Sequence, residues 1–148
     1  MRMRPVTRAD EAVWLALRGQ LWPESTDRHA EDVRRFFAGA SREPLAVLLA
    51  EDPDTRAIGF VELSIRAYAE GCKTDCVAFV EGWFVVPAAQ RRGVGRALLA
   101  AAEEWARSQG CSEFASDAEL DNEDSAAAHR AAGFTEVGSV RCFRKILA

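Results

Sequence analysis

One stretch of the sequence constrains the fold more than any other, because an apolar run leads through a glycine- and arginine-rich turn into a helical pattern. The run covers residues 77–86, Val-Ala-Phe-Val-Glu-Gly-Trp-Phe-Val-Val, and Pro87 ends it. Apolar residues fill both faces of this run, so we predict a central strand that is covered on both sides. The turn, residues 90–95, reads Gln-Arg-Arg-Gly-Val-Gly and opens a helix predicted over residues 93–109.

Apolar periodicity predicts the other elements of the chain. The predicted strands cover residues 1–5, 45–50, 57–66, 77–86 and 112–116, with two more short strands between 134 and 147. The predicted helices are one with Val13, Trp14, Leu17 and Leu21 on one face, one carrying Val33, Phe36 and Phe37, the helix over 93–109, and a short helix from Asn122 to Gly133. Hairpins and a β-α-β crossover occur together in this order, which predicts an α+β class with a mixed sheet. A chain of 148 residues fits one domain, 1–148.

The balance of charge argues against a nucleic-acid partner. The net charge is −4, and the basic residues gather only locally, at Arg91, Arg92 and Arg96. A protein that binds nucleic acid without sequence preference needs a broad basic surface, so we expect no nucleic-acid partner. A basic cluster in an acidic protein indicates one anionic ligand, with acidic surface left for a cation.

The sequence contains no segment that indicates a membrane or an export route. Its apolar runs are all shorter than the roughly 20 residues that span a bilayer, and the N-terminal residues lack the pattern of a secretory signal. We therefore expect a cytoplasmic protein with no membrane partner.

The four cysteines, Cys72, Cys76, Cys111 and Cys142, do not have the spacing of a zinc site or of a redox pair. We expect reduced, structural thiols and no metal site.

The glycine-rich turn has the properties of a phosphate-binding loop. A helix N-terminus presents unpaired N–H groups and the positive end of a dipole, and glycines let a phosphate approach the backbone. A Gly-x-Gly pair before a helix can equally be an ordinary turn. The turn lacks both the Gly-Lys-Ser/Thr ending of a nucleotide-binding P-loop and the full Gly-x-Gly-x-x-Gly pattern of dinucleotide sites.

The whole pattern, Gln-x-x-Gly-x-Gly after a strand ending in Val-Pro, resembles the acyl-CoA motif of the GCN5-related N-acetyltransferase (GNAT) superfamily. That resemblance implies the GNAT fold, a central mixed and mostly antiparallel sheet flanked by helices. It also implies acetyl-CoA as co-substrate, with the pantetheine arm along residues 83–86 and the pyrophosphate at residues 91–96. The residues implied to bind it are Trp83, Phe84, Val85, Val86, Arg91, Arg92, Gly93, Val94, Gly95, Arg96 and Asn122.

A second signature of the superfamily is matched with one departure. The chain has Asn122, Ser125, Gly133 and Phe134 at the expected spacing, but His129 stands where the family has a tyrosine. That tyrosine often protonates the departing thiolate, and an imidazole, whose pKa lies near neutrality, can do the same. A packing or capping histidine is the alternative.

Two carboxylates are the candidates for binding and deprotonating an amine. Glu81 lies inside the buried strand, where an ionised carboxylate is costly unless it is paired or faces a polar cleft. Asp117 ends the strand that we expect beside it. A cationic amine must lose a proton before it attacks a thioester, which suits a carboxylate base. The predicted catalytic residues are therefore Asp117, Glu81 and His129, although a structural salt bridge for Glu81 and a capping role for Asp117 stay open.

Several further segments are similar to the aminoglycoside 6′-N-acetyltransferases within the superfamily. They are residues 21–23, 68–72, 77–82, 110–117, 120–122 and 129–130. The resemblance implies an aminoglycoside as the small-molecule amine substrate, a homodimer, and an aminoglycoside pocket lined by Trp22, Tyr68, Glu81 and Asp117. It further implies direct attack of the 6′-amine, with a backbone amide near Val85 or Val86 stabilising the oxyanion. The alternatives are another acceptor, such as a polyamine, a small amine or a protein N-terminus, and a CoA-binding module without turnover.

Overall fold

A computed structural model describes the backbone of residues 1–148 and every side chain except that of Thr26. The described residues form one five-stranded sheet in the order β1-β2-β3-β4-β5. The strands are β1 (Arg2–Pro5), β2 (Ala46–Glu51), β3 (Ala57–Arg66), β4 (Val77–Val85) and β5 (Glu113–Ser116). The first four pair antiparallel and β5 joins β4 in parallel, which confirms the expected mixed, mostly antiparallel sheet.

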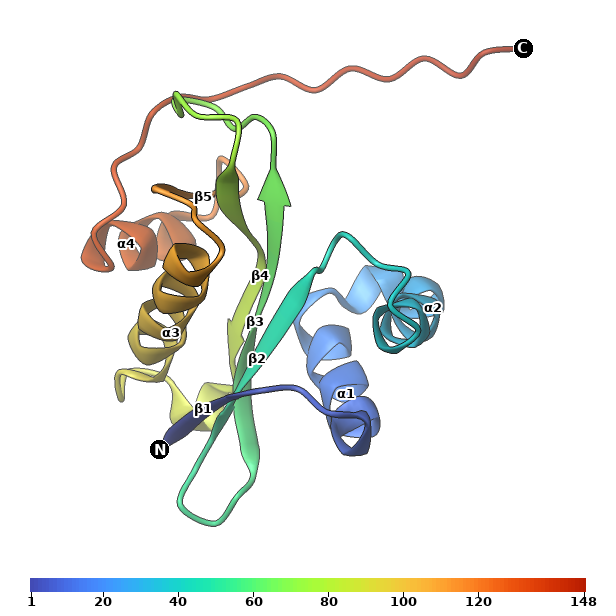
Figure 1. Cartoon of the computed structure of the whole chain (residues 1–148), viewed down its shortest axis with the longest axis vertical. Coiled ribbons are helices and arrows are strands. Elements are labelled where there is room, and N and C mark those ends of the chain that lie inside the picture. The colour runs from blue at the N-terminus through green and yellow to red at the C-terminus, as the bar shows by residue number, and fades with distance from the viewer.

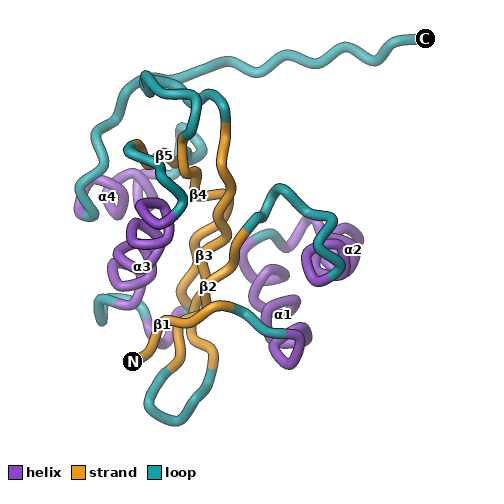
Figure 2. Tube along the Cα trace, viewed as in Figure 1, coloured by secondary structure: helices purple, strands orange, loops and turns teal.

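The helices cover both faces of this sheet. They are α1 (Glu11–Leu21), α2 (Thr26–Phe37), α3 (Val94–Ser108) and α4 (Glu123–Ala131), with short 3₁₀ turns η1 (Arg8–Asp10), η2 (Pro23–Ser25) and η3 (Pro87–Ala89). Figure 1 shows α1 and α2 on one side of the sheet and α3 and α4 on the other. The same view in Figure 2 separates the strands from the connecting loops. No described helix is long and apolar enough to cross a membrane.

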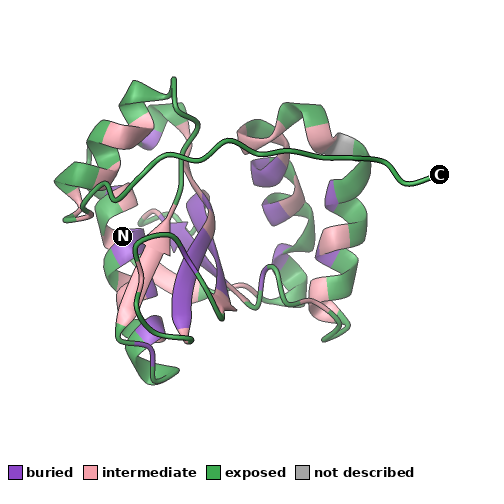
Figure 3. Cartoon of the chain, turned by 90° about the horizontal axis from the view of Figure 1, so that it is seen from above, coloured by how far each residue is buried: buried purple, intermediate pink, exposed green. Residues whose placement is uncertain are grey.

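The core on the α3 side follows from the helical spacing of the apolar residues of that helix. Val94, Leu98 and Ala102 are buried and pack against Val61 and Val80 of the sheet. Gly110, with φ of 82°, ends the helix as expected. The buried residues lie on the inner faces, between the sheet and its helices (Figure 3).

The core on the other side is built around Trp14 of α1 and Val33 of α2, both buried against Phe60. The predicted apolar stripe of α1 is only partly right. Val13 is exposed, and the charged Arg18 is buried in its place, 6% exposed. A buried guanidinium needs partners, and these lie beneath the candidate site described below.

The divergence of β4 from β5 creates the site. β5 pairs with β4 only over residues 77–80, whereas β3 follows β4 as far as Val85. The edge of β4 that faces β5 is therefore unpaired from Glu81 onward. The register also shifts there, because Gly82 pairs with Glu62 and Val80 with Leu63, which leaves Glu81 as the extra residue of a β-bulge. Bulges re-aim side chains and are common beside active sites.

The two strands predicted between residues 134 and 147 are wrong, because no described residue after α4 belongs to a strand. Phe134 stacks on Phe114 of β5, and the side chain of Val137 fills the space beside Gly71. Beyond this contact the chain extends away from the domain (Figure 1), so its backbone reaches no strand with which to pair.

All four cysteines are free thiols; Cys111 is buried, as expected for a structural thiol, whereas Cys142 is exposed. The sulfur atoms of Cys76 and Cys111 lie 3.2 Å apart. Burial raises the pKa of the Cys111 thiol to about 11, which keeps it protonated and unreactive near neutral pH.

Candidate active site

A cavity of about 210 Å³ lies where β4 and β5 diverge. It is lined by the end of α1, the second half of β4, the residues after β5 and the first turns of α4: Leu21, Trp22, Val80, Glu81, Gly82, Trp83, Ser116, Asp117, Ala118, Glu119, Asn122, Ser125 and His129. The cavity thus brings together six predicted site residues: Trp22, Glu81, Trp83, Asp117, Asn122 and His129. Tyr68 is not among the lining residues; it is 65% exposed in the loop after β3, beside Glu70, whose carboxylate raises the pKa of the phenol.

Glu81 is both ion-paired and part of the cavity wall. Arg66 of β3 donates to its two oxygens at 3.0 Å and 2.8 Å, and Ser64 donates a further, short hydrogen bond. The salt bridge that the sequence left as an alternative is therefore present. It does not remove the functional interpretation, because a bidentate arginine fixes the carboxylate in one orientation against the cavity.

Asp117 has a different environment from Glu81. It directly follows the last residue of β5 and is exposed to solvent. A carboxylate in contact with both the cavity and bulk water can accept a proton and pass it on. The two predicted carboxylates thus divide into one that is held rigidly and one that is solvated.

Trp22 lies directly against the backbone of β4. A Cβ atom added at Gly82 would stand 2.5 Å from the Trp22 ring, so the absence of a side chain there leaves room for the indole. The Trp22 carbonyl accepts a hydrogen bond at 2.8 Å from Nε2 of His29 in α2, and the Arg18 guanidinium lies 5.1 Å from the indole centroid. The indole is therefore held from both sides as a wall of the cavity.

Arg18 and His29 belong to a buried polar network that also includes Glu62. Arg18 donates to His29 Nδ1 at 3.2 Å, to Glu62 at 3.3 Å and to Asp32 at 2.9 Å. Burial raises the pKa of Glu62 to about 7, against the opposing effects of the Arg18 charge and the Trp14 hydrogen bond. This network was not predicted from the sequence. The sequence feature that could have indicated it is Glu62, a glutamate inside the apolar strand predicted over residues 57–66. The same kind of feature identified Glu81 as a candidate.

His129 is fixed by hydrogen bonds on both ring nitrogens. Nδ1 lies 2.7 Å from the Ser125 carbonyl oxygen, and Nε2 lies 2.7 Å from the Ser116 hydroxyl oxygen. The ring also meets Trp83 edge-on, with the centroids 5.3 Å apart. The sequence analysis did not single out Ser116, because a lone serine at the end of a strand carries no signal of its own.

The predicted phosphate-binding turn has an unusual backbone. Arg91 and Gly93 both adopt left-handed conformations, with φ of 62° and 80°, and Gly93 is the N-cap of α3. A Cβ added at Gly93 would meet no atom within 4 Å, so this side of the turn is open. This open turn lies at the N-terminus of α3, where the first N–H groups have no partner within the helix, as an anion site requires.

Gly95 and Arg96, at the start of α3, also make contacts within the protein. Arg96 donates from Nη2 to the Ala131 carbonyl at the end of α4, so its guanidinium ties two helices together. A Cβ at Gly95 would stand 3.1 Å from the Trp83 ring, and the Trp83 indole N–H donates to the Gly95 carbonyl at 3.1 Å. Gly95 therefore makes room for Trp83, whereas Arg91 and Arg92 are exposed at the open side of the turn.

The amide of Val86 cannot be the predicted oxyanion donor, because it donates to the Ile58 carbonyl at 2.9 Å. N–H groups alternate between the two edges of a strand, so the Val85 N–H points to the unpaired edge of β4. Of the two amides considered from the sequence, Val85 is the one that faces the site.

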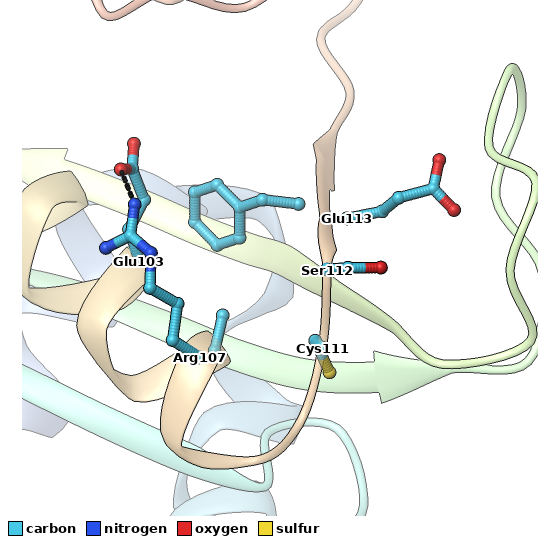
Figure 4. Close-up of a pocket in the computed structure, with 7 residues that line it drawn as sticks. Glu103, Arg107, Cys111, Ser112 and Glu113 are labelled. Carbon is cyan, nitrogen blue, oxygen red and sulfur yellow. Dashed lines mark hydrogen bonds and ion pairs between the residues drawn. The ribbon is translucent and has the colours of Figure 1, made fainter.

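A second cavity, of about 120 Å³, lies between α3 and β5 (Figure 4). Its wall includes the Glu103–Arg107 ion pair and Cys111, and Figure 4 shows Glu113 directed away from that pair. Glu113 instead accepts backbone N–H groups of Lys73 and Thr74. None of the predicted site residues lines this cavity.

Comparison with known proteins agrees with this geometry. A sequence model of the Acetyltransferase (GNAT) family matches residues 12–134. An aminoglycoside N(6′)-acetyltransferase type 1 of Klebsiella aerogenes is 56% identical, covering 98% of this chain and 96% of that protein. One of Acinetobacter baumannii is 42% identical, covering 98% of both.

Solved structures of the same kind superpose over nearly the whole chain. The apo aminoglycoside 6′-N-acetyltransferase AAC(6′)-Ig of Acinetobacter haemolyticus has a TM-score of 0.91 at 40% identity, covering 100% of both chains. AAC(6′)-Iy in complex with the bisubstrate analogue CoA-S-monomethyl-acetylneamine has a TM-score of 0.90 at 36% identity, covering 99% of this chain and 98% of that one. The chain therefore belongs to the GNAT family of acetyltransferases.

Proposed function

We propose that this protein is an aminoglycoside 6′-N-acetyltransferase that uses acetyl-CoA as acetyl donor. The observation that carries the proposal is the cavity itself, which combines the unpaired edge of β4 with the carboxylates of Glu81 and Asp117. The relatives of known name are acetyltransferases of this kind, and one solved relative holds a CoA–neamine bisubstrate analogue.

The second half of β4 and the turn before α3 form the part of the site that binds acetyl-CoA. The pyrophosphate is held by the N–H groups that follow Gly93, with Arg91 and Arg92 supplying positive charge. The pantetheine arm lies along β4 at Trp83 and Val85, whose N–H groups face the unpaired edge, as in the addition of a strand to a sheet. The Val85 N–H then stabilises the developing oxyanion. Asn122, whose side chain caps α4 by accepting from the Ser125 N–H at 3.0 Å, lies at the thioester end.

The acceptor half is suited to a polycation. Glu81, Asp117 and Glu119 line the cavity, and the chain as a whole carries a net charge of −4. Trp22 and the immobile Glu81 position the aminoglycoside, and Tyr68 extends the binding surface from its exposed loop. Asp117 helps to remove the proton of the 6′-ammonium, which it passes to water, and the resulting amine attacks the thioester directly.

The role of Asp117 is tested by Asp117→Asn. We expect kcat for a 6′-amino drug to fall roughly tenfold to hundredfold, with less loss at high pH, where the amine is already deprotonated. Glu81→Gln should mainly raise KM for the drug. Acetyl-CoA affinity should hardly change in either variant. Wild-type kinetics in both variants, or a loss confined to acetyl-CoA affinity, would contradict this assignment.

The proposed activity itself is tested by thiol release from acetyl-CoA with pairs of aminoglycosides that differ only in a 6′-amine or a 6′-hydroxyl. We expect turnover with the 6′-amino member of each pair alone. Equal turnover with both members, or turnover only with a polyamine or peptide, would favour another acceptor. Binding of CoA with no turnover by any amine would favour a CoA-binding module.

We further propose that the enzyme is a cytoplasmic homodimer. Acetyl-CoA is a cytoplasmic metabolite. Support for the dimer comes from the C-terminal segment, residues 138–147, which exposes Val140, Phe143, Ile146 and Leu147. β5 is at the edge of the sheet, so a second copy can supply a strand to it.

A further inference from the structure

The hydrogen bonds of His129 fix the position of its proton. The Ser125 carbonyl, 2.7 Å from Nδ1, can only accept a hydrogen bond, so Nδ1 carries the proton of the neutral ring. The Ser125 hydroxyl is farther from the same nitrogen, at 3.3 Å. Nε2 of the neutral imidazole is consequently an acceptor, and the Ser116 hydroxyl, 2.7 Å away, donates to it.

This arrangement conflicts with direct protonation of the leaving thiolate by neutral His129. The single N–H proton of the neutral ring is donated in a hydrogen bond to a backbone carbonyl of the same helix. Nε2 therefore carries no proton that it could donate to the thiolate. Ser116, like His129, lines the cavity together with Asp117 and Trp83. The Ser116 hydroxyl, which is hydrogen-bonded to Nε2, is therefore a group through which that nitrogen can exchange a proton with a molecule bound in the cavity.

We propose that the Ser116 hydroxyl is a catalytic proton relay that links His129 to the nitrogen and sulfur of the acetyl transfer. This inference rests on the proposed acetyltransferase activity. It adds to the role of Asp117, which removes the first proton, that of the substrate ammonium. The relay handles the second proton, which remains on nitrogen after the amine has attacked.

The step balances without a further reactant. Attack forms the C–N bond, and the proton of the new N⁺–H passes to the Ser116 oxygen while the Ser116 proton passes to His129 Nε2. As the C–S bond breaks, the sulfur takes the proton of the Ser116 hydroxyl, and Ser116 recovers one from Nε2. The products are the amide and the CoA thiol, and both Ser116 and His129 return to their starting states.

Both protonation states of His129 suit this cycle. Neutral His129 accepts from Ser116 and leaves the lone pairs of the hydroxyl oxygen toward the cavity, as a base requires. Protonated His129 donates from Nε2, so that the Ser116 O–H turns toward the cavity as an acid. The charged groups that share the cavity with this pair are the carboxylates of Glu81, Asp117 and Glu119.

The proton position can be tested in the ligand-free protein by imidazole ¹⁵N NMR. The chain has two histidines, which serve as controls for each other. His29 accepts from Arg18 at Nδ1 and donates from Nε2, so its neutral form carries the opposite tautomer. We expect one Nδ1–H and one Nε2–H ring at high pH, and Ser116→Ala should perturb only the His129 signals. A neutral His129 with its proton on Nε2 would overturn the relay.

The catalytic role is tested by the variants Ser116→Ala, Ser116→Thr and His129→Gln. We expect Ser116→Ala to lower kcat at least tenfold with unchanged acetyl-CoA affinity, and Ser116→Thr, which keeps the hydroxyl, to restore most of the rate. The double variant Ser116→Ala/His129→Gln should be no slower than the worse single variant, because the two groups act in one relay. Ser112→Ala, an exposed serine on the same segment outside this cavity, is the matched control.

The outcomes separate the relay from the function on which it rests. An active wild type whose rate is unchanged by Ser116→Ala, or additive losses in the double variant, overturns the relay and leaves the acetyltransferase intact. A wild type that transfers acetyl to no amine overturns the function itself. The tautomer measurement tests the hydrogen-bond geometry in either case.

Discussion

At the scale of single residues, the acceptor side depends on the contact between Trp22 and the backbone at Gly82. The indole occupies the space that a side chain at Gly82 would need, and a Cβ there would stand 2.5 Å from the ring. The Arg18–His29 network anchors the Trp22 backbone through the bond from His29 to the Trp22 carbonyl, and the Arg18 guanidinium lies 5.1 Å from the indole centroid. The shape of the cavity is therefore set by residues that have no catalytic role in the proposed reaction.

Gly82→Ala is predicted to displace Trp22 and raise KM for the aminoglycoside roughly tenfold. Acetyl-CoA affinity should change much less, since a Cβ at Gly82 would point at Trp22 and Leu21 and leave the phosphate-binding turn untouched. Steady-state kinetics with each substrate varied in turn is the measurement. Gly19→Ala is the control, because a Cβ at that position of α1 meets nothing within 4 Å. An unaltered KM in Gly82→Ala would refute the role of Trp22 as a cavity wall.

The buried carboxyl group of Glu62 should make the free energy of unfolding depend on pH. Its pKa rises from an ordinary value of 4.5 to about 7 on folding, chiefly because of burial. Between these pH values the folded protein keeps a proton that the unfolded chain has released, so the free energy of unfolding falls as pH rises through this window. Glu62→Gln should flatten that decline, as measured by urea denaturation across the window. The exposed Glu11→Gln should leave the slope unchanged, and an equally steep slope in Glu62→Gln would count against the assignment.

At the scale of elements, the first turn of α3 connects backbone conformation to cofactor binding. Gly93 and Gly110 bound the two ends of this helix, with φ of 80° and 82°, and a Cβ at either position would meet nothing within 4 Å. They differ in that only Gly93 belongs to the proposed pyrophosphate site. Comparing the same substitution at Gly93 and at Gly110 therefore separates the effect of backbone strain on stability from the effect on acetyl-CoA binding.

Gly93→Ala and Gly110→Ala should lose similar stability, about 1–2 kcal/mol, because each forces alanine into the left-handed region. Only Gly93→Ala should weaken acetyl-CoA binding, by roughly tenfold or about 1.4 kcal/mol. Thermal unfolding and calorimetric titration measure the two effects. If both variants bind acetyl-CoA like the wild type, the pyrophosphate lies elsewhere.

The elements also show where prediction from sequence succeeds. β3 covers Ala57–Arg66 as predicted, β4 ends one residue early and α3 is one residue shorter at each end, because strong apolar periodicity and glycine or proline boundaries define these elements. The network of Arg18, His29 and Glu62 was not predicted. Its members are far apart in the chain, and only tertiary packing brings them together. Ser116 was missed for the same reason.

At the scale of the whole molecule, the C-terminal segment has the composition of strands but pairs with no strand of the same chain. Its composition is that of strands, which is why strands were predicted there, but a strand forms only beside another strand. In the single chain it extends away from the sheet (Figure 1), with Phe143 90% exposed. The proposed dimer would supply the missing partner.

Deletion of residues 138–148 is predicted to convert a dimer into a monomer. The segment exposes several apolar side chains, and burying each in an interface contributes about 1.5–3 kcal/mol. Sedimentation velocity of wild type and deletion variant is the measurement, with Ser139→Ala as a control that should stay dimeric. A monomeric wild type, or a deletion variant that remains a dimer, would refute the proposed role of this segment.

The central claim is that the cavity between β4 and β5 delivers acetyl to one particular amine. The most direct measurement is the position of the acetyl group in the product, determined by NMR after the wild-type protein has acted on an aminoglycoside that carries a 6′-amine among several others. We expect acetylation of the 6′ nitrogen alone. Acetylation of a different amine, or no acetylated product from a protein that binds acetyl-CoA, would contradict it.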